Sequence, residues 1–156
     1  MQKRTEKIIN EVNRAVIQFR GIYSEWSKQH NISYNEMLVF YTIREHGFCT
    51  QKQICDSYLL PRQTINNVIK KMRTEGILEQ SRQMYIGREK SFSLTLKGEE
   101  YSKKVMESLN NVEEHALQIM GKDKMLLMTE LIYEYSKSLK EAMQQDLKGK
   151  IENGAK

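Results

Sequence analysis

Apolar positions at both ends of the chain recur every three or four residues, which is the spacing of an amphipathic α-helix. Near the N-terminus the pattern covers residues 5–30 and predicts one long helix. Near the C-terminus it predicts two more, from Thr95 to about Met120 and over about 123–147, interrupted by Gly121. The apolar positions of the first helix are Ile8, Ile9, Val12, Ala15, Val16, Phe19, Ile22, Tyr23 and Trp26.

Two capping motifs mark helix starts in the middle of the chain. An S-x-x-E motif begins at residue 33 and a T-x-x-Q motif at residue 50. In each, the two side chains can bond the backbone amide at the other position, which satisfies amides that a helix start leaves unpaired. The motifs predict helices that run to Gly47 and to about Tyr58.

A further helix is predicted at about residues 61–75, because Pro61 suits a first helical position and Gly76 can end it. Its apolar face comprises Ile65, Val68, Ile69 and Met72. The opposite face carries Gln63, Asn67, Lys70 and Thr74, with Asn66 and Lys71 on its flanks. Two helices joined by a short turn, the second with a polar outer face, are typical of a helix-turn-helix.

Two strands are predicted after this motif, over residues 77–82 and 91–96. In the second, Phe92, Leu94 and Leu96 alternate with small polar residues, as in a strand with one buried face. The connection between the strands carries Arg88 and Lys90. We therefore expect a mainly α protein with a small antiparallel β-wing.

The net charge is concentrated in the predicted winged unit. Residues 51–97 hold nine Lys/Arg and four acidic residues, and their net charge of +5 equals the formal net charge of the whole chain. Such a local excess of positive charge favours binding to a polyanion through release of counterions. At 156 residues, the chain has the length of one domain. No apolar run approaches the roughly 18 residues of a membrane span, and the N-terminus lacks the apolar segment of a secretory signal, so we expect a cytoplasmic protein without membrane contact.

The long terminal helices predict a homodimer. A helix of about 25 residues spans about 37 Å, which is too long to fold back over a compact basic unit. Its apolar stripe needs a partner, and the same helices of a second copy are the simplest one.

The order of these elements, with two sequence motifs, resembles the MarR family of winged-helix regulators. The first motif is T-x-x-x-x-x-x-x-M-x-x-x-G-I-L, which begins at Thr64, and the second is S-L-T-x-x-G, which ends at Gly98. The resemblance implies that the helix at 61–75 enters the major groove of double-stranded DNA. It also implies that a wing arginine enters the minor groove, and Arg88 occupies that arginine's position. Family members often have an aspartate two residues earlier, where this chain has Ile86.

The expected DNA contacts divide into base readers and phosphate ligands. Amides of Gln63, Asn66 and Asn67 can make bidentate contacts to adenine, although surface asparagines are also common without a function. Cationic side chains more often contact phosphate. The full set of expected DNA-binding residues is Arg62, Gln63, Thr64, Asn66, Asn67, Lys70, Lys71, Arg73, Arg88 and Lys90. A solvated loop arginine is the alternative for Arg88.

The resemblance also implies a pocket for a small aromatic or amphipathic ligand, near the junction of the dimer helices and the winged unit. The expected lining is Phe19, Tyr23, Trp26, Met37, Tyr41 and Tyr58. Ordinary core packing is the alternative for each of these side chains.

Other chemistry has little support in the sequence. Cys55 is expected to be a buried structural thiol and Cys49 to be more exposed, with redox sensing as the alternative for both. No His or Cys pair has metal-ligand spacing, and no nucleotide-binding or catalytic motif occurs, so we expect no metal, no cofactor and no enzyme.

The sequence therefore predicts an N-terminal dimerisation helix at 1–32, a winged helix-turn-helix domain at 33–97 with a wing at about 77–96, C-terminal dimerisation helices at 98–147 and a frayed tail at 148–156. The expected function is a sequence-specific transcriptional regulator, more often a repressor than an activator in that family, which binds a pseudo-palindromic operator and is released by a ligand. A sequence-neutral nucleoid module or a protein-interaction module is the alternative.

Overall fold

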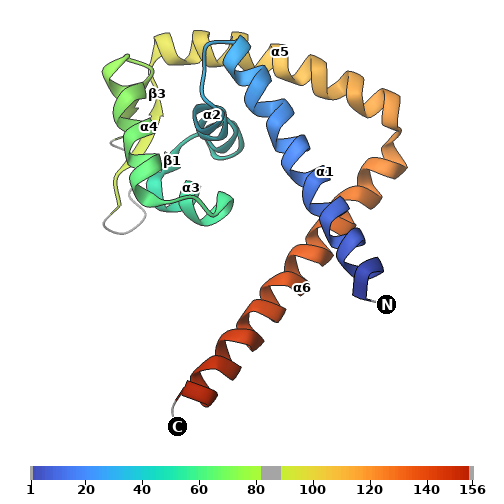
Figure 1. Cartoon of the computed structure of the whole chain (residues 1–156). Coiled ribbons are helices and arrows are strands. Elements are labelled where there is room, and N and C mark those ends of the chain that lie inside the picture. Colours follow the sequence, from blue (N-terminus) through green and yellow to red (C-terminus); the bar gives the residue numbers. More distant parts are fainter. Residues whose placement is uncertain (1, 82–88, 155–156) are drawn as a thin grey trace. The chain divides into compact units, whose positions relative to one another are not determined.

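The computed structural model describes residues 2–81 and 89–154, with side chains for 3–81 and 89–150. Its helices are α1 (Gln2–Gln29), α2 (Tyr34–His46), α3 (Gln51–Tyr58), α4 (Arg62–Thr74), α5 (Leu96–Met120) and α6 (Lys122–Gly154). Its strands are β1 (Cys49–Thr50), β2 (Leu78–Gln80) and β3 (Ser91–Leu94) (Figure 1). The predicted fold class, mainly α with a small antiparallel sheet, is confirmed.

The chain divides into two compact units, Met1–Glu107 and Ser108–Lys156. The first unit contains helices α1 to α4, the sheet and the first part of α5. The second contains the rest of α5 and helix α6. Gly121 separates these two helices with a left-handed φ of 87°, as the sequence predicted.

Both predicted capping boxes are present. The Glu36 amide donates to Ser33 Oγ at 3.2 Å, and the Ser33 amide donates to Glu36 Oε2 at 2.6 Å. At the start of α3, Thr50 and Gln53 exchange the equivalent bonds at 3.0 and 3.3 Å. These local hydrogen bonds explain why α2 and α3 begin where they do.

Helix α4 begins one residue later than predicted. Pro61 occupies the N-cap position with extended backbone (φ −61°, ψ 137°), and the helix starts at Arg62. Gly76 follows the helix with φ 71°, a conformation that glycine adopts at little cost. The predicted apolar face points inward, since Ile65, Ile69 and Met72 are buried.

The three strands form an antiparallel sheet in the order β1-β3-β2. Leu78 pairs with Leu94 across β2 and β3, while Cys49 pairs with Phe92 across β1 and β3. The described parts of β2 and β3 are shorter than predicted, and β1 was not predicted. The wing residues 82–88, Arg88 among them, lie outside the described residues.

The start of α5 packs directly against the backbone that leads into β2. Thr95 Oγ1 accepts a hydrogen bond from the Gly98 amide at 3.0 Å and donates to the Gly76 carbonyl at 2.6 Å. A Cβ atom on Gly98 would lie 2.0 Å from the carbonyl oxygen of Ile77. Glycine is therefore the residue that permits this close approach.

The expectation for Cys49 is wrong. This side chain is fully buried at 0% exposure, because β1 places it against β3 instead of at an open helix boundary. Burial raises the pKa of its thiol to about 12. Cys55 is buried as predicted, and burial raises its pKa as well. Burial thus favours the protonated form of both thiols.

The apolar stripes of the terminal helices are exposed. On α1 they include Ile8, Val12, Val16 and Phe19, and on α6 Leu127, Leu131, Tyr135, Leu139 and Met143. Helix α6 continues to Gly154, so the tail expected to fray from residue 148 is helical that far. Within the described part of the chain, no helix has the length and apolar character needed to cross a bilayer.

Candidate nucleic-acid interface

The outer face of α4 is a continuous exposed surface of amide and cationic side chains. Its exposed members are Arg62, Gln63, Asn66, Asn67, Lys70, Arg73 and Thr74, while Thr64 is half-buried. The helix packs its opposite face against α3, α2 and β2, so the polar face is left free for a partner. Most of the expected base readers and phosphate ligands therefore lie on one surface.

Hydrogen bonds orient the amides on this surface. Gln63 Nε2 donates to Asn67 Oδ1 at 3.0 Å, one helical turn away. Gln51 Nε2, at the start of α3, donates to Asn66 Oδ1 at 3.0 Å. Gln51 was not predicted as a site residue. The sequence signal for Gln51 was its place as the first helical residue after the Thr50 cap, because that end of α3 lies beside α4.

Cations border the amide surface. The Arg73 guanidinium lies 5.7 Å from the centroid of the Phe92 ring, a cation–π distance that ties α4 to β3. Arg62 and Lys90, far apart in the sequence, line the same cavity of about 160 Å³ at the base of the wing. The other described residues that line it are Gln51, Lys52, Glu89 and Phe92.

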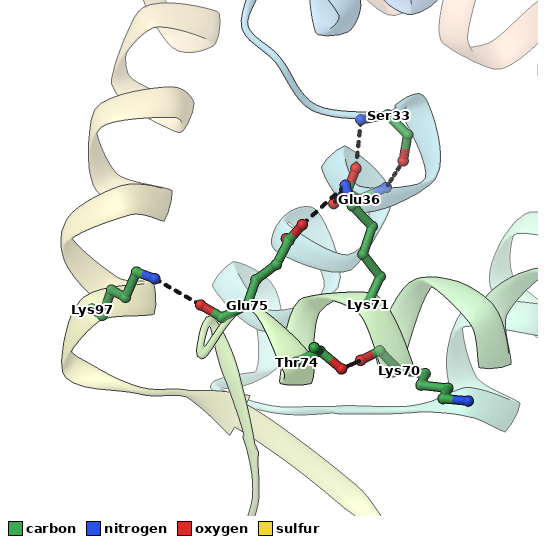
Figure 2. A network of polar contacts seen from close by, with 7 residues as sticks. All are labelled: Ser33, Glu36, Lys70, Lys71, Thr74, Glu75 and Lys97. Atoms are coloured by element: carbon green, nitrogen blue, oxygen red, sulfur yellow. Dashed lines mark hydrogen bonds and ion pairs between the residues drawn. The ribbon is translucent and has the colours of Figure 1, made fainter.

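Lys71 differs from its neighbours on α4. Its Nζ lies 2.7 Å from Glu36 Oε1 on α2 and 3.6 Å from Glu75 Oε1. Figure 2 shows Lys71 and Lys70 leaving α4 on different sides, with only Lys71 directed at Glu36. Since its charge balances a carboxylate of the protein itself, we do not include Lys71 among the phosphate ligands that the sequence suggested.

Glu36 is a buried carboxylate with a full set of partners. Burial by itself would raise its pKa, but hydrogen bonds from Lys71 and from the Ser33 backbone and side chain outweigh that effect and hold the pKa below its ordinary value. Glu36 therefore remains charged at neutral pH although its side chain is only 5% exposed.

A cavity of about 540 Å³ lies between α1, α2 and α3. It is lined by Phe19, Tyr23, Tyr34, Met37, Leu38, Tyr41, Arg44, Glu45 and Tyr58. Five of the six expected pocket residues are among them. The sixth, Trp26, does not line this cavity and instead stacks on His30 with ring centroids 3.9 Å apart.

The described lining of the cavity is largely aromatic and includes one cation, Arg44, and one acid, Glu45. Phe19 and Tyr23 pack edge to face at 5.2 Å, and the Arg44 guanidinium lies 5.1 Å from the Tyr41 ring centroid. Tyr34, Leu38, Arg44 and Glu45 were missed by the sequence reasoning. All four lie three or four residues from Met37 or Tyr41 on α2, so helical spacing was the signal that could have found them.

The described residues hold no group of three His, Cys, Asp or Glu side chains able to bind a metal ion.

Solved structures share the fold of this chain. A MarR family regulator from Neisseria meningitidis has a TM-score of 0.80 at 21% identity, covering 88% of this chain and 97% of that chain. NadR in complex with 4-hydroxyphenylacetate has a TM-score of 0.67 at 19% identity, covering 81% of this chain and 92% of that chain. Staphylococcus aureus MarR in complex with salicylate and kanamycin has a TM-score of 0.66 at 16% identity, covering 88% of this chain and 93% of that chain. No protein-family model and no curated protein matches the sequence.

The architecture defines the class of the protein as a winged helix-turn-helix protein with long terminal helices. More specifically, its fold is that of the MarR family transcriptional regulators, in agreement with the resemblance seen in the sequence.

Proposed function

We propose that this protein is a homodimeric transcriptional regulator, most simply a repressor, that binds a specific operator in double-stranded DNA in the cytoplasm. The main support is the exposed amide and cationic face of α4. On a helix-turn-helix scaffold, this face is the one that enters the major groove.

In this proposal the amides read bases and the cations bind phosphate. Gln63, Asn66 and Asn67 lie on the face that would meet base edges. Thr64 lies at its margin. Arg62, Lys70, Arg73 and Lys90 would contact phosphates. Arg88, known here only from its place in the sequence, would enter the minor groove.

The exposed apolar stripes on α1 and α6 support dimerisation. Exposed apolar patches of this extent are rare on monomers and mark surfaces that another chain covers. A two-fold dimer would present two α4 helices to successive major grooves, and its operator would be an inverted repeat.

The aromatic cavity supports regulation by a small ligand. Its volume of about 540 Å³ falls in the usual range for small-molecule sites. Aromatic walls with Arg44 at the margin suit a small aromatic anion, the class to which the salicylate and 4-hydroxyphenylacetate of the neighbouring structures belong. Such a ligand would release the operator by binding more tightly to a dimer conformation unfit for DNA.

Competition with nonspecific DNA tests the proposal. A regulator should retain a genomic operator fragment in the presence of a large excess of random-sequence DNA, because base contacts add to the phosphate contacts. A sequence-neutral nucleoid protein would lose the fragment in proportion to the competitor. A protein-interaction module would bind neither DNA. Either of these results would contradict the proposal.

A further inference from the structure

The ion pair between Glu36 and Lys71 joins two helices that have different tasks in the proposed function. Glu36 lies at the N-terminus of α2, and Lys71 lies in the last turns of α4. Lys71 Nζ lies 2.7 Å from Glu36 Oε1, although the two residues are 35 positions apart in the sequence. The carboxylate is 5% exposed and the lysine side chain 53% exposed, so the lysine reaches from the surface to a buried acid.

The surroundings of this pair add further connections (Figure 2). Glu75, at the end of α4, also contacts Lys71, and its backbone carbonyl accepts a hydrogen bond from Lys97 on α5 at 2.7 Å. The buried acid itself is anchored in the capping box of α2 by Ser33. The C-terminal end of α4 is thus linked by polar contacts to both α2 and α5.

Helix α2 also forms much of the aromatic cavity. Met37, the residue directly after Glu36, lines the cavity, as do Leu38, Tyr41 and Arg44 along the same helix. The ion pair therefore connects the helix that lines the cavity to the helix that carries the amide surface.

We propose that Lys71 is a positioning residue, which acts through Glu36 to fix the orientation of α4 on α2 and hence the presentation of its amide face to bases. This proposal rests on the proposed function. Lys71 would contact no DNA. Its partner is the carboxylate, and the effect of losing it would appear in discrimination between sequences.

Helix α4 should stay folded without the pair. Ile65, Ile69 and Met72 anchor it through burial, and Glu36 keeps its hydrogen bonds to Ser33. What the helix loses is a polar contact that selects one orientation on an otherwise apolar surface. Apolar burial is not directional, whereas a charged hydrogen bond is.

Adjacent lysines supply a matched pair of variants. Lys70→Met and Lys71→Met each remove one positive charge from neighbouring positions of α4. Lys70→Met should weaken binding to operator and random DNA alike and reduce the slope of log K against log salt by about one unit. Lys71→Met should leave the slope unchanged and reduce the ratio of operator to random-DNA affinity about tenfold. Lys71→Arg should restore most of that ratio.

The interpretation fails if Lys71→Met behaves like Lys70→Met, with a smaller salt slope and an unchanged affinity ratio, because Lys71 would then be a phosphate ligand. If Lys71→Met does not fold, Glu36→Gln provides the same test. Glutamine preserves the capping box but removes the carboxylate, and it should reduce the affinity ratio without changing the salt slope. An unchanged ratio would overturn the proposal.

Measuring unfolding as a function of pH tests the ion pair between Glu36 and Lys71 in the absence of DNA. The folded pKa of Glu36 is lowered from 4.5, so its contribution to stability is full above about that pH and is lost as pH falls through the folded value. Besides Lys71, Ser33 and Tyr101 interact with Glu36, while Glu75 interacts with Lys71. Lys71→Met should be less stable than wild type at pH 7, and this difference in stability should close as pH falls through the lowered pKa of Glu36 and the carboxylate is protonated. Lys70→Met should follow wild type throughout.

The two assays separate two kinds of failure. If wild type does not prefer the operator, the proposed function fails and the DNA role of Lys71 fails with it, while the pH profiles still establish whether the ion pair is present. If wild type prefers the operator but the Lys71→Met stability gap does not change with pH, the link through Glu36 is wrong although the proposed function stands.

Discussion

At the scale of single residues, Gly98 is the position where one methyl group matters most. Gly98→Ala would place a Cβ 2.0 Å from the Ile77 carbonyl oxygen, a backbone atom that can yield only if α5 shifts. We expect the free energy of unfolding to fall by at least about 1–3 kcal/mol, the usual cost of overpacking. Urea denaturation measures this.

Gly149→Ala is the control for that substitution. Gly149 lies within α6, where an added Cβ meets nothing within 4 Å. Alanine should therefore stabilise the helix by up to about 1 kcal/mol through its greater helix propensity. Equal effects of the two substitutions would contradict the close packing at Gly98.

Residue-level features were predictable where their cause is local. The two capping boxes, the cap of α5 at Thr95 and the break at Gly121 follow from side chains that act within four residues of sequence. The burial of Cys49 and the ion pair of Lys71 were not predicted, because the surroundings of both residues come from elsewhere in the chain. Cys49 is buried by a strand partner, and Lys71 pairs with an acid 35 residues away.

At the scale of elements, DNA binding by helix α4 and by the wing should differ in salt dependence. If Arg88 enters the minor groove as proposed, Arg88→Ala should weaken binding to every sequence and reduce the slope of log K against log salt by about one unit, because one positive charge at the DNA is lost. Asn67→Ala should leave the slope unchanged and cost roughly 1–3 kcal/mol of discrimination at one base pair. Titrations on operator and random DNA over a salt series measure both.

Unchanged affinity and salt slope in Arg88→Ala would mean that the wing does not contact DNA. An Asn67→Ala variant that discriminates as well as wild type would remove that amide from the set of base readers. Because the two variants report on different elements, one expectation can fail while the other holds.

Element types were predicted well by periodicity, and extents less well. Helices α1, α5 and α6 repeat their apolar positions over many turns, so their pattern is unmistakable. Strand β1 has two residues, too few for any alternation to be visible, and is defined entirely by its pairing with β3. The cavity lining was also only partly predicted, since Tyr34, Leu38, Arg44 and Glu45 were not among the expected residues.

At the scale of the whole molecule, dimerisation should depend on the apolar stripe of α6. Leu139→Glu would place a charge in a seam that we expect to be dry and without a counter-ion. We expect a monomer in sedimentation experiments and loss of operator binding. Gln144→Glu adds the same charge five residues further along, on the opposite side of the helix, where the wild-type side chain is exposed and polar, and should remain dimeric.

A dimer that survives Leu139→Glu would exclude this part of α6 from the interface. Sequence alone suggested the dimer, because long amphipathic helices need a partner for their apolar side. The exposure of these stripes supports that inference, but the geometry of a seam between two chains depends on both surfaces together and cannot be derived from the pattern of one.

The central claim is that the protein reads a specific, two-fold symmetric DNA site. Selection of genomic fragments by the purified protein, followed by footprinting, tests this most directly. We predict a small set of fragments that share an imperfect inverted repeat, with adenine-rich half-sites about one helical turn, roughly 34 Å, apart. Fragments that share no sequence, or footprints without inverted symmetry, would contradict it.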